Sequence, residues 1–110
     1  MYRLSTIIEE VFRKYLPVAE RRKIILNLDF PDVTKRVDRP SRVRGPLNKA
    51  VGEAVARAKR NVSIMVGRDN VRVMDDGRAL TPDELAELSE PEHIEVKSRV
   101  GFGTEVLIWF

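Results

Sequence analysis

The residues with the clearest chemical potential lie in the stretch 71–80, VRVMDDGRAL. Asp75 ends an alternating apolar pattern that is typical of a strand, and Gly77 follows it in a turn. A carboxylate at the exit of a buried strand can accept a hydrogen bond from a ligand donor such as an exocyclic amine. The other interpretation is structural, with Asp75 capping the turn at Asp76 and Gly77.

Two further positions with chemical potential are Glu53 and His93. Glu53 lies between Lys49 and Arg57 at a spacing of four residues, which is typical of a salt-bridged, solvated helix face. His93 is the only histidine, and it lies at the expected start of a strand. We expect it to be a surface or edge residue, without a catalytic, metal-binding or phosphoacceptor role.

Composition limits the classes of function. The 110 residues fit a single domain, residues 1–110, and 43% hydrophobic with 34% charged residues is typical of a globular protein. No stretch is apolar enough for a membrane span or a signal peptide, and the chain has no cysteine, so a cytoplasmic location is expected. The chain also lacks glutamine, which suggests a thermophilic source.

Nucleic-acid binding is not expected either. The net charge of +3 is mild, acidic residues interrupt the basic runs, and only 6% of residues are aromatic. A solvated surface accounts for these runs.

The elements that must position these residues follow from hydrophobic periodicity. Apolar residues at helical spacing predict a helix over residues 4–16, with a kink at Pro17. Ser5 or Thr6 is available as its cap, and Thr6 and Glu9 have the spacing of a capping box. A second helix is expected from Ser41 to about residue 59, with its first turn distorted by Pro46. A short third helix is expected over residues 83–89, with Leu85 and Leu88 directed inward.

Alternating patterns predict strands over residues 24–28, 34–37, 62–66, 71–75, 94–96 and 106–110. Residues 67–70 close a hairpin, and Gly101-Phe102-Gly103 closes another. Three helices with about five strands predict an α+β fold: a two-layer sandwich whose mixed sheet is covered on one face by the helices.

The order of these elements resembles the ATP-binding catalytic domain of sensor histidine kinases, a histidine kinase-like (GHKL) ATPase domain with the Bergerat fold. The resemblance covers almost the whole chain. Its matching segments are residues 4–11, 19–29, 39–43, 75–80 and 85–91, with the closing hairpin of residues 96–98 and 101–106. The resemblance implies that Asp75, Gly77, Ala79 and Thr104 occupy the positions that bind the adenine nucleotide, ATP or ADP with magnesium.

Three departures from the family pattern bear on activity. The magnesium-holding Asn of the family is replaced by Glu53 or, in another alignment register, by Arg57. Ala79 stands where the family has the second Gly of its adenine-binding box. After Pro91 the next strand follows at once, so about thirty residues are missing that would form the ATP lid and the phosphate-binding glycine box.

From these departures we expect a degenerate domain, without autonomous kinase activity, that acts as a protein-interaction module in two-component signalling. Its partner would be a histidine kinase dimerisation hairpin, a response regulator or a second copy of the chain. The alternative is a reduced ATP- or ADP-binding domain that needs a partner chain for phosphoryl transfer. In that case Asp75, Gly77 and Thr104 would hold the nucleotide, and Glu53 would be the candidate magnesium ligand.

Overall fold

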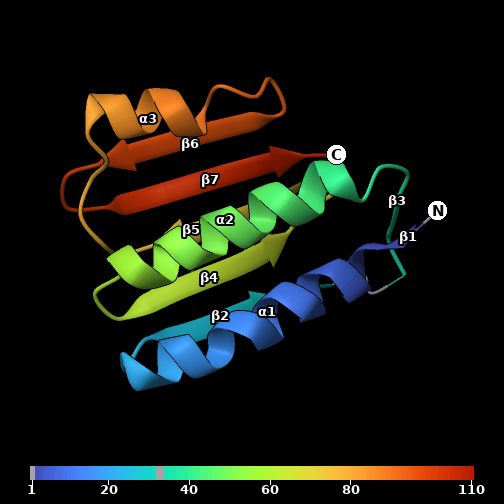
Figure 1. Ribbon diagram of the computed structural model, residues 1–110, viewed down its shortest axis with the longest axis horizontal. Coiled ribbons are helices and arrows are strands. Elements are labelled where there is room, and N and C mark those ends of the chain that lie inside the picture. The colour runs from blue at the N-terminus through green and yellow to red at the C-terminus, as the bar shows by residue number, and fades with distance from the viewer. Residues whose placement is uncertain (1, 32–33) are drawn as a thin grey trace.

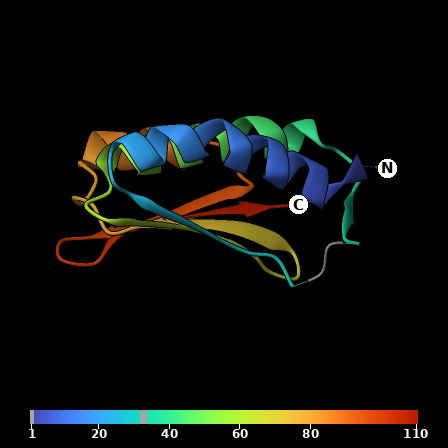
Figure 2. The ribbon, with the colours of Figure 1, turned by 90° about the horizontal axis from the view of Figure 1, so that it is seen from below.

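The computed structural model describes residues 2–31 and 34–110 and has two layers, a sheet and three helices on one of its faces (Figures 1 and 2). The elements in chain order are β1 (Tyr2–Arg3), α1 (Leu4–Arg21), β2 (Ile25–Asp29), β3 (Arg36–Val37), α2 (Ser41–Arg57), β4 (Asn61–Val66), β5 (Asn70–Asp75), α3 (Pro82–Leu88), β6 (Ile94–Arg99) and β7 (Gly103–Trp109).

The main sheet is mixed and has the strand order β2-β4-β5-β7-β6. Strand β2 runs parallel to β4, and the other neighbours are antiparallel. All three helices lie on the same side of this sheet, and the opposite face is bare (Figure 2). The expected α+β two-layer sandwich, with a five-stranded mixed sheet and three helices, is therefore confirmed for the described residues.

The core lies between the sheet and the helices α1 and α2. Both helices present the apolar stripes that their periodicity predicts, and these stripes are buried against the inward residues of the strands. The largest fully buried side chains are Leu4, Ile7, Ile8, Leu47, Ile64 and Ile108. Gly52 allows α1 to approach α2, because a Cβ at this position would lie 2.8 Å from the Tyr15 hydroxyl.

Helix α1 begins at Leu4, as its apolar stripe predicts, but it lacks the proposed cap. Its N-cap is Arg3, which makes no side-chain capping bond, so the expected capping box of Thr6 and Glu9 is wrong. The reason is the unpredicted strand β1, which pairs with β3 and brings the Leu4 amide within 2.9 Å of the Lys35 carbonyl oxygen. Pro17 lies inside the helix, which continues to Arg21.

Helix α2 also runs through its proline, and His93 explains how. Pro46 has no N–H to donate to the carbonyl four residues earlier, that of Arg42. The ring Nε2–H of His93 donates to this Arg42 oxygen at 2.9 Å instead. His93 thus satisfies a helical carbonyl and ties the start of β6 to the first turns of α2. In the described part of the chain, no helix is long and apolar enough to cross a membrane.

Candidate functional site

The centre of the candidate site is a buried ion pair between Asp75, the last residue of β5, and Arg57, the last residue of α2. Arg57 Nη2 lies 2.7 Å from Asp75 Oδ2, and Nε donates to the same oxygen at 3.2 Å. The two side chains are only 7% and 1% exposed, respectively. A carboxylate buried to this degree needs a countercharge, and the guanidinium of Arg57 supplies it.

The second oxygen of Asp75 is used by the turn that follows the strand. Gly77 N–H donates to Asp75 Oδ1 at 2.9 Å, as the turn-cap interpretation of this residue requires. Glycine is needed here because a Cβ would lie 2.2 Å from the Arg57 carbonyl oxygen. Both oxygens of the carboxylate therefore have partners, and a ligand amine would have to compete with a buried guanidinium.

Thr104 lies directly beside this pair, whereas Ala79 does not. Thr104 is the register partner of Asp75 across strands β5 and β7, and it is buried. Its hydroxyl lies 2.9 Å from Ser98 Oγ, which in turn accepts a hydrogen bond from Leu80 N–H at 2.8 Å. Ala79 is half-buried in the loop beyond, where its carbonyl accepts from the Arg78 guanidinium. The structure thus brings together Asp75, Gly77 and Thr104.

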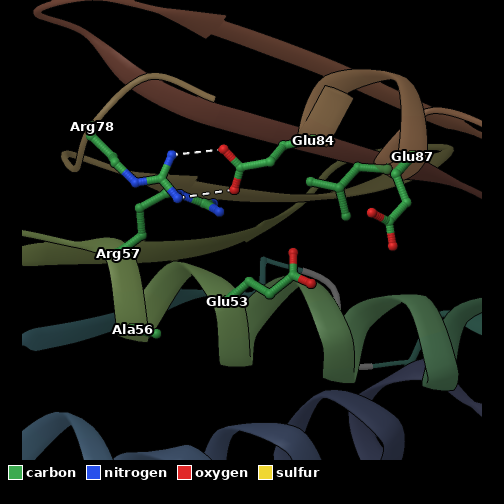
Figure 3. A pocket seen from close by; sticks show the side chains of 7 residues that line it. Glu53, Ala56, Arg57, Arg78, Glu84 and Glu87 are labelled. Carbon is green, nitrogen blue, oxygen red and sulfur yellow. Dashed lines mark hydrogen bonds and ion pairs between the residues drawn. The ribbon is translucent and has the colours of Figure 1, made fainter. Parts of the chain in front are cut away.

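Glu53 lines a cavity of about 320 Å³ between α2 and α3 (Figure 3). Figure 3 shows its carboxylate pointing away from α2, towards the side where Glu84 and Glu87 lie. The expected ladder of ion pairs along α2 is not formed, because Lys49 pairs with Glu87 at 3.8 Å and Arg57 pairs with Asp75. Within the described residues, no three acidic or histidine side chains are grouped closely enough to hold a metal ion.

An ion pair in the lining of this cavity joins Arg78 to Glu84. Arg78 donates to both oxygens of Glu84, at 2.8 and 2.9 Å. Glu84 also forms a capping box with Thr81 at the start of α3. The hydrogen bonds that Arg78 and then the Thr81 amide donate to Glu84 lower the pKa of Glu84 to about 2. The same bonds from Arg78 to Glu84 raise the pKa of Arg78. Glu84 is therefore ionised at every physiological pH.

The charges in this cavity do not suit a nucleotide triphosphate with magnesium. Three carboxylates, those of Glu53, Glu84 and Glu87, face it, while both of its guanidinium groups are already paired with carboxylates. A triphosphate would be repelled by the carboxylates and would have no unpaired guanidinium in the cavity to bind. Residues 89–93 connect α3 directly to β6, so the described chain has no lid segment between them.

Sequence reasoning missed two contacts at this site. It considered Arg57 only as a surface residue or as the Asn replacement, although a strand-end Asp in the core should have prompted a search for a cation. It also missed Asp76, whose carboxylate accepts hydrogen bonds from the amides of Lys59, Arg60 and Asn61. No short-range pattern signals that contact, because Asp76 lies sixteen residues after Arg60.

No family model and no curated protein sequence matches this chain. Solved structures do match it. The cytoplasmic segment of histidine kinase QseC aligns with a TM-score of 0.74 and 17% identity, covering 99% of this chain and 72% of that one. The catalytic domain of histidine kinase ThkA aligns with a TM-score of 0.71 and 16% identity, covering 98% and 92%.

Full-length ShkA in complex with AMPPNP aligns with a TM-score of 0.72 and 20% identity, covering 96% of this chain and 29% of ShkA. At such identities the likeness concerns the fold, and it extends over nearly every residue of the chain. The chain has the fold of the catalytic domains of histidine kinases.

Proposed function

We propose that this chain is a histidine kinase-type domain that does not phosphorylate by itself and acts by binding another protein. The observation that carries the proposal is the ion pair of Asp75 with Arg57, which occupies the carboxylate that would otherwise receive the adenine amine. A buried pair with a distance of 2.7 Å is costly to break, because either charge left alone in the interior is strongly destabilising.

The acidic cavity and the short connection after α3 support the same proposal. Phosphoryl transfer depends on groups that position the phosphates and neutralise their charge. Here Glu53, Glu84 and Glu87 face the cavity. The connection from α3 to β6 consists of residues 89–93, which is too short to cover it. We therefore expect nucleotide binding in this cleft to be lost or very weak.

A second, apolar hollow of about 190 Å³ continues the cleft between α2 and α3. Its apolar lining includes Pro46, Ala50, Ile94 and Val106, and it shares Glu87 and Leu88 with the acidic cavity. Helix α3 has no fully buried residue, so its apolar side chains remain partly open to solvent. An apolar hollow beside an acidic one fits a protein segment with apolar and basic side chains, from a signalling partner or from a second copy of the chain.

Calorimetric titration with ATP and ADP, with and without magnesium, tests the loss of the adenine site. We expect no heat that depends on Asp75, so wild type and Asp75→Asn should give the same isotherms. Circular dichroism must first show that the variant is folded, because the substitution weakens the buried pair. Heat in the wild type that disappears in Asp75→Asn would contradict the proposal.

Sedimentation over a concentration series, alone and with candidate signalling proteins, tests the binding role. Leu88→Lys places a charge between the two hollows and should weaken association by about tenfold or more. Ile25→Lys is the matched control, because Ile25 is 59% exposed on the bare face of the sheet. An equal loss in both variants, or association that neither changes, would contradict binding through this cleft.

The alternative function is a reduced nucleotide-binding domain completed by a partner chain. The placement of Thr104 and Gly77 around Asp75 favours it, since these three residues remain together at the strand ends. The solved ShkA structure with the same fold contains AMPPNP. Under this alternative, Asp75→Asn abolishes ATP or ADP binding, and the titration above separates the two proposals.

A further inference from the structure

The opposite end of α2 carries a pocket that neither the fold nor the proposed function explains. Its volume is about 480 Å³, which is within the range of small-ligand sites, roughly 300–1,000 Å³. Four cations line it, Lys35, Arg36, Arg39 and Arg42, against the two carboxylates of Asp38 and Asp69. We call it the basic pocket. It lies near β3 and the first turn of α2, far from the candidate site at the other end of that helix (Figure 1).

Within the described residues, the guanidinium groups of Arg36, Arg39 and Arg42 have no partner. Their side chains form no salt bridge and no hydrogen bond there, even though Asp38 and Asp69 share the pocket with them. The fourth cation, Lys35, is engaged, because its ammonium donates to the Arg68 carbonyl and lies 5.4 Å from the centre of the Phe110 ring. The free donors of the pocket are therefore guanidinium groups.

The backbone concentrates further positive charge at this place. Arg3 is the register partner of Arg36 in the β1–β3 pair, so two like charges stand opposite each other. Such a pair is destabilising, and a bound anion would relieve the repulsion. The first turn of α2 adds its dipole, and its N-cap, Pro40, provides no side-chain acceptor for the helix amides.

We propose that the basic pocket binds a small ligand with two adjacent phosphate groups. Arginine is suited to this chemistry because its planar fork donates two parallel hydrogen bonds to a phosphate. Three unpaired forks around one cavity offer more donors than a single phosphate group needs. The ring of Phe110 gives one wall an apolar surface against which an organic part of the ligand can pack.

A compact ligand fits these observations better than a nucleic acid does. A backbone of many phosphates needs a continuous basic track along the surface. The other basic runs, at residues 21–23 and 57–60, lie at the far end of the molecule (Figure 1). The unpaired cations are instead gathered around one hollow with acidic residues among them.

Titration calorimetry of the full chain with inorganic pyrophosphate, at about 0.15 M salt, tests the proposal. The double variant Arg39→Gln/Arg42→Gln should weaken binding by about tenfold or more, because it removes two charged donors. The control is Arg21→Gln/Arg60→Gln, which lowers the net charge equally at the far end of the molecule and should change binding by less than about twofold.

Four outcomes would overturn the proposal. They are the absence of binding at millimolar pyrophosphate, an equal loss in both double variants, orthophosphate binding as tightly as pyrophosphate, and displacement of pyrophosphate by lower concentrations of a single-stranded oligonucleotide. Pyrophosphate has no adenine, so its binding does not depend on Asp75. If the heat of ATP or ADP binding is unchanged in Asp75→Asn but absent in Arg39→Gln/Arg42→Gln, the nucleotide is bound in the basic pocket.

Discussion

The two ends of helix α2 differ in whether their charged side chains have partners. At the C-terminal end, Arg57 is paired with Asp75, and the Arg22 guanidinium donates to the Val55 carbonyl. Asp76 accepts hydrogen bonds from the amides of the residues just after the helix. At the N-terminal end, Arg39 and Arg42 stand without partners in the described residues.

This contrast distinguishes charged side chains that stabilise the fold from charged side chains that are available to bind a ligand. Removing a buried, matched pair should lower the free energy of unfolding. Unpaired surface cations contribute little to that free energy, so their substitution should instead weaken ligand binding. The following substitutions test that division, from the largest expected effect to the smallest.

Asp75→Ala should lower the free energy of unfolding by roughly 3–5 kcal/mol, because it leaves the guanidinium of Arg57 buried without a countercharge. Urea denaturation followed by circular dichroism measures this loss. The double variant Asp75→Leu/Arg57→Leu should recover much of it, since apolar side chains can replace a buried pair. A loss below about 1 kcal/mol in the single variant is typical of an exposed salt bridge, and it would contradict a structural role for this pair.

Gly103→Ala should cost more than Gly101→Ala, although both glycines have a positive φ, +89° and +87°. Gly101 has no neighbour within 4 Å, so alanine there carries only backbone strain, about 1–2 kcal/mol. A Cβ at Gly103 would lie 1.9 Å from the Asp75 carbonyl oxygen, which should add about 1–3 kcal/mol. Thermal and urea unfolding of both variants measures the difference, and equal losses would contradict the close approach of β7 to the end of β5.

Asp76→Asn should lower stability by about 1 kcal/mol at neutral pH. Partial burial opposes ionisation, but the hydrogen bonds from the Arg60, Asn61 and Lys59 amides outweigh it and lower the pKa of Asp76. Because the folded-state pKa lies below the unfolded one, the stabilisation is present at neutral pH and is lost as the pH falls below about 4.

The difference between wild type and Asp76→Asn should therefore shrink on acidification, as measured by urea denaturation at several pH values. Asp29→Asn is the control, since Asp29 is exposed on β2 and its side chain forms no hydrogen bond or ion pair with the described residues. A difference that stays constant from pH 7 to about pH 3 would show that the carboxylate charge is not involved.

Arg36→Gln should leave stability unchanged or raise it by a few tenths of a kcal/mol, because it relieves the repulsion with Arg3 across the β1–β3 pair. Thermal unfolding in low and high salt measures this effect, which should vanish as salt screens the two charges. A clear loss of stability would mean that Arg36 has a structural partner, and the contrast between the two ends of α2 would fail.

Much of the fold could be predicted because its determinants are local. The apolar stripes of α1 and α2 and the alternation in β4 and β5 each appear within one segment, and burial follows from them directly. The N-terminal cap of α1 could not be predicted in this way, because it depends on the pairing of Arg3 with Arg36, which lies far along the chain.

The candidate site shows the same limit more sharply. The position of Asp75 at the end of a strand can be predicted from the sequence, whereas its pairing with Arg57 depends on how α2 packs against β5. Arg57 and Asp75 are eighteen residues apart, and their contact exists only once helix and sheet are packed. The spacing of Lys49, Glu53 and Arg57 is equally compatible with a row of surface ion pairs along α2 and with a buried pair of Arg57 with Asp75. Only the packing of the helix on the sheet distinguishes the two arrangements.

The loose seating of α3 has a consequence for local unfolding. Its seven residues are held by the Thr81 capping box, by contacts with β6 and by two ion pairs of partly or fully exposed side chains, Glu84 with Arg78 and Glu87 with Lys49. Segments with few buried contacts open at a lower free energy than the whole domain does. The amide protons of α3 should therefore exchange with solvent well before those of α2, so the wall of the cleft can move while the sheet and the two long helices stay folded.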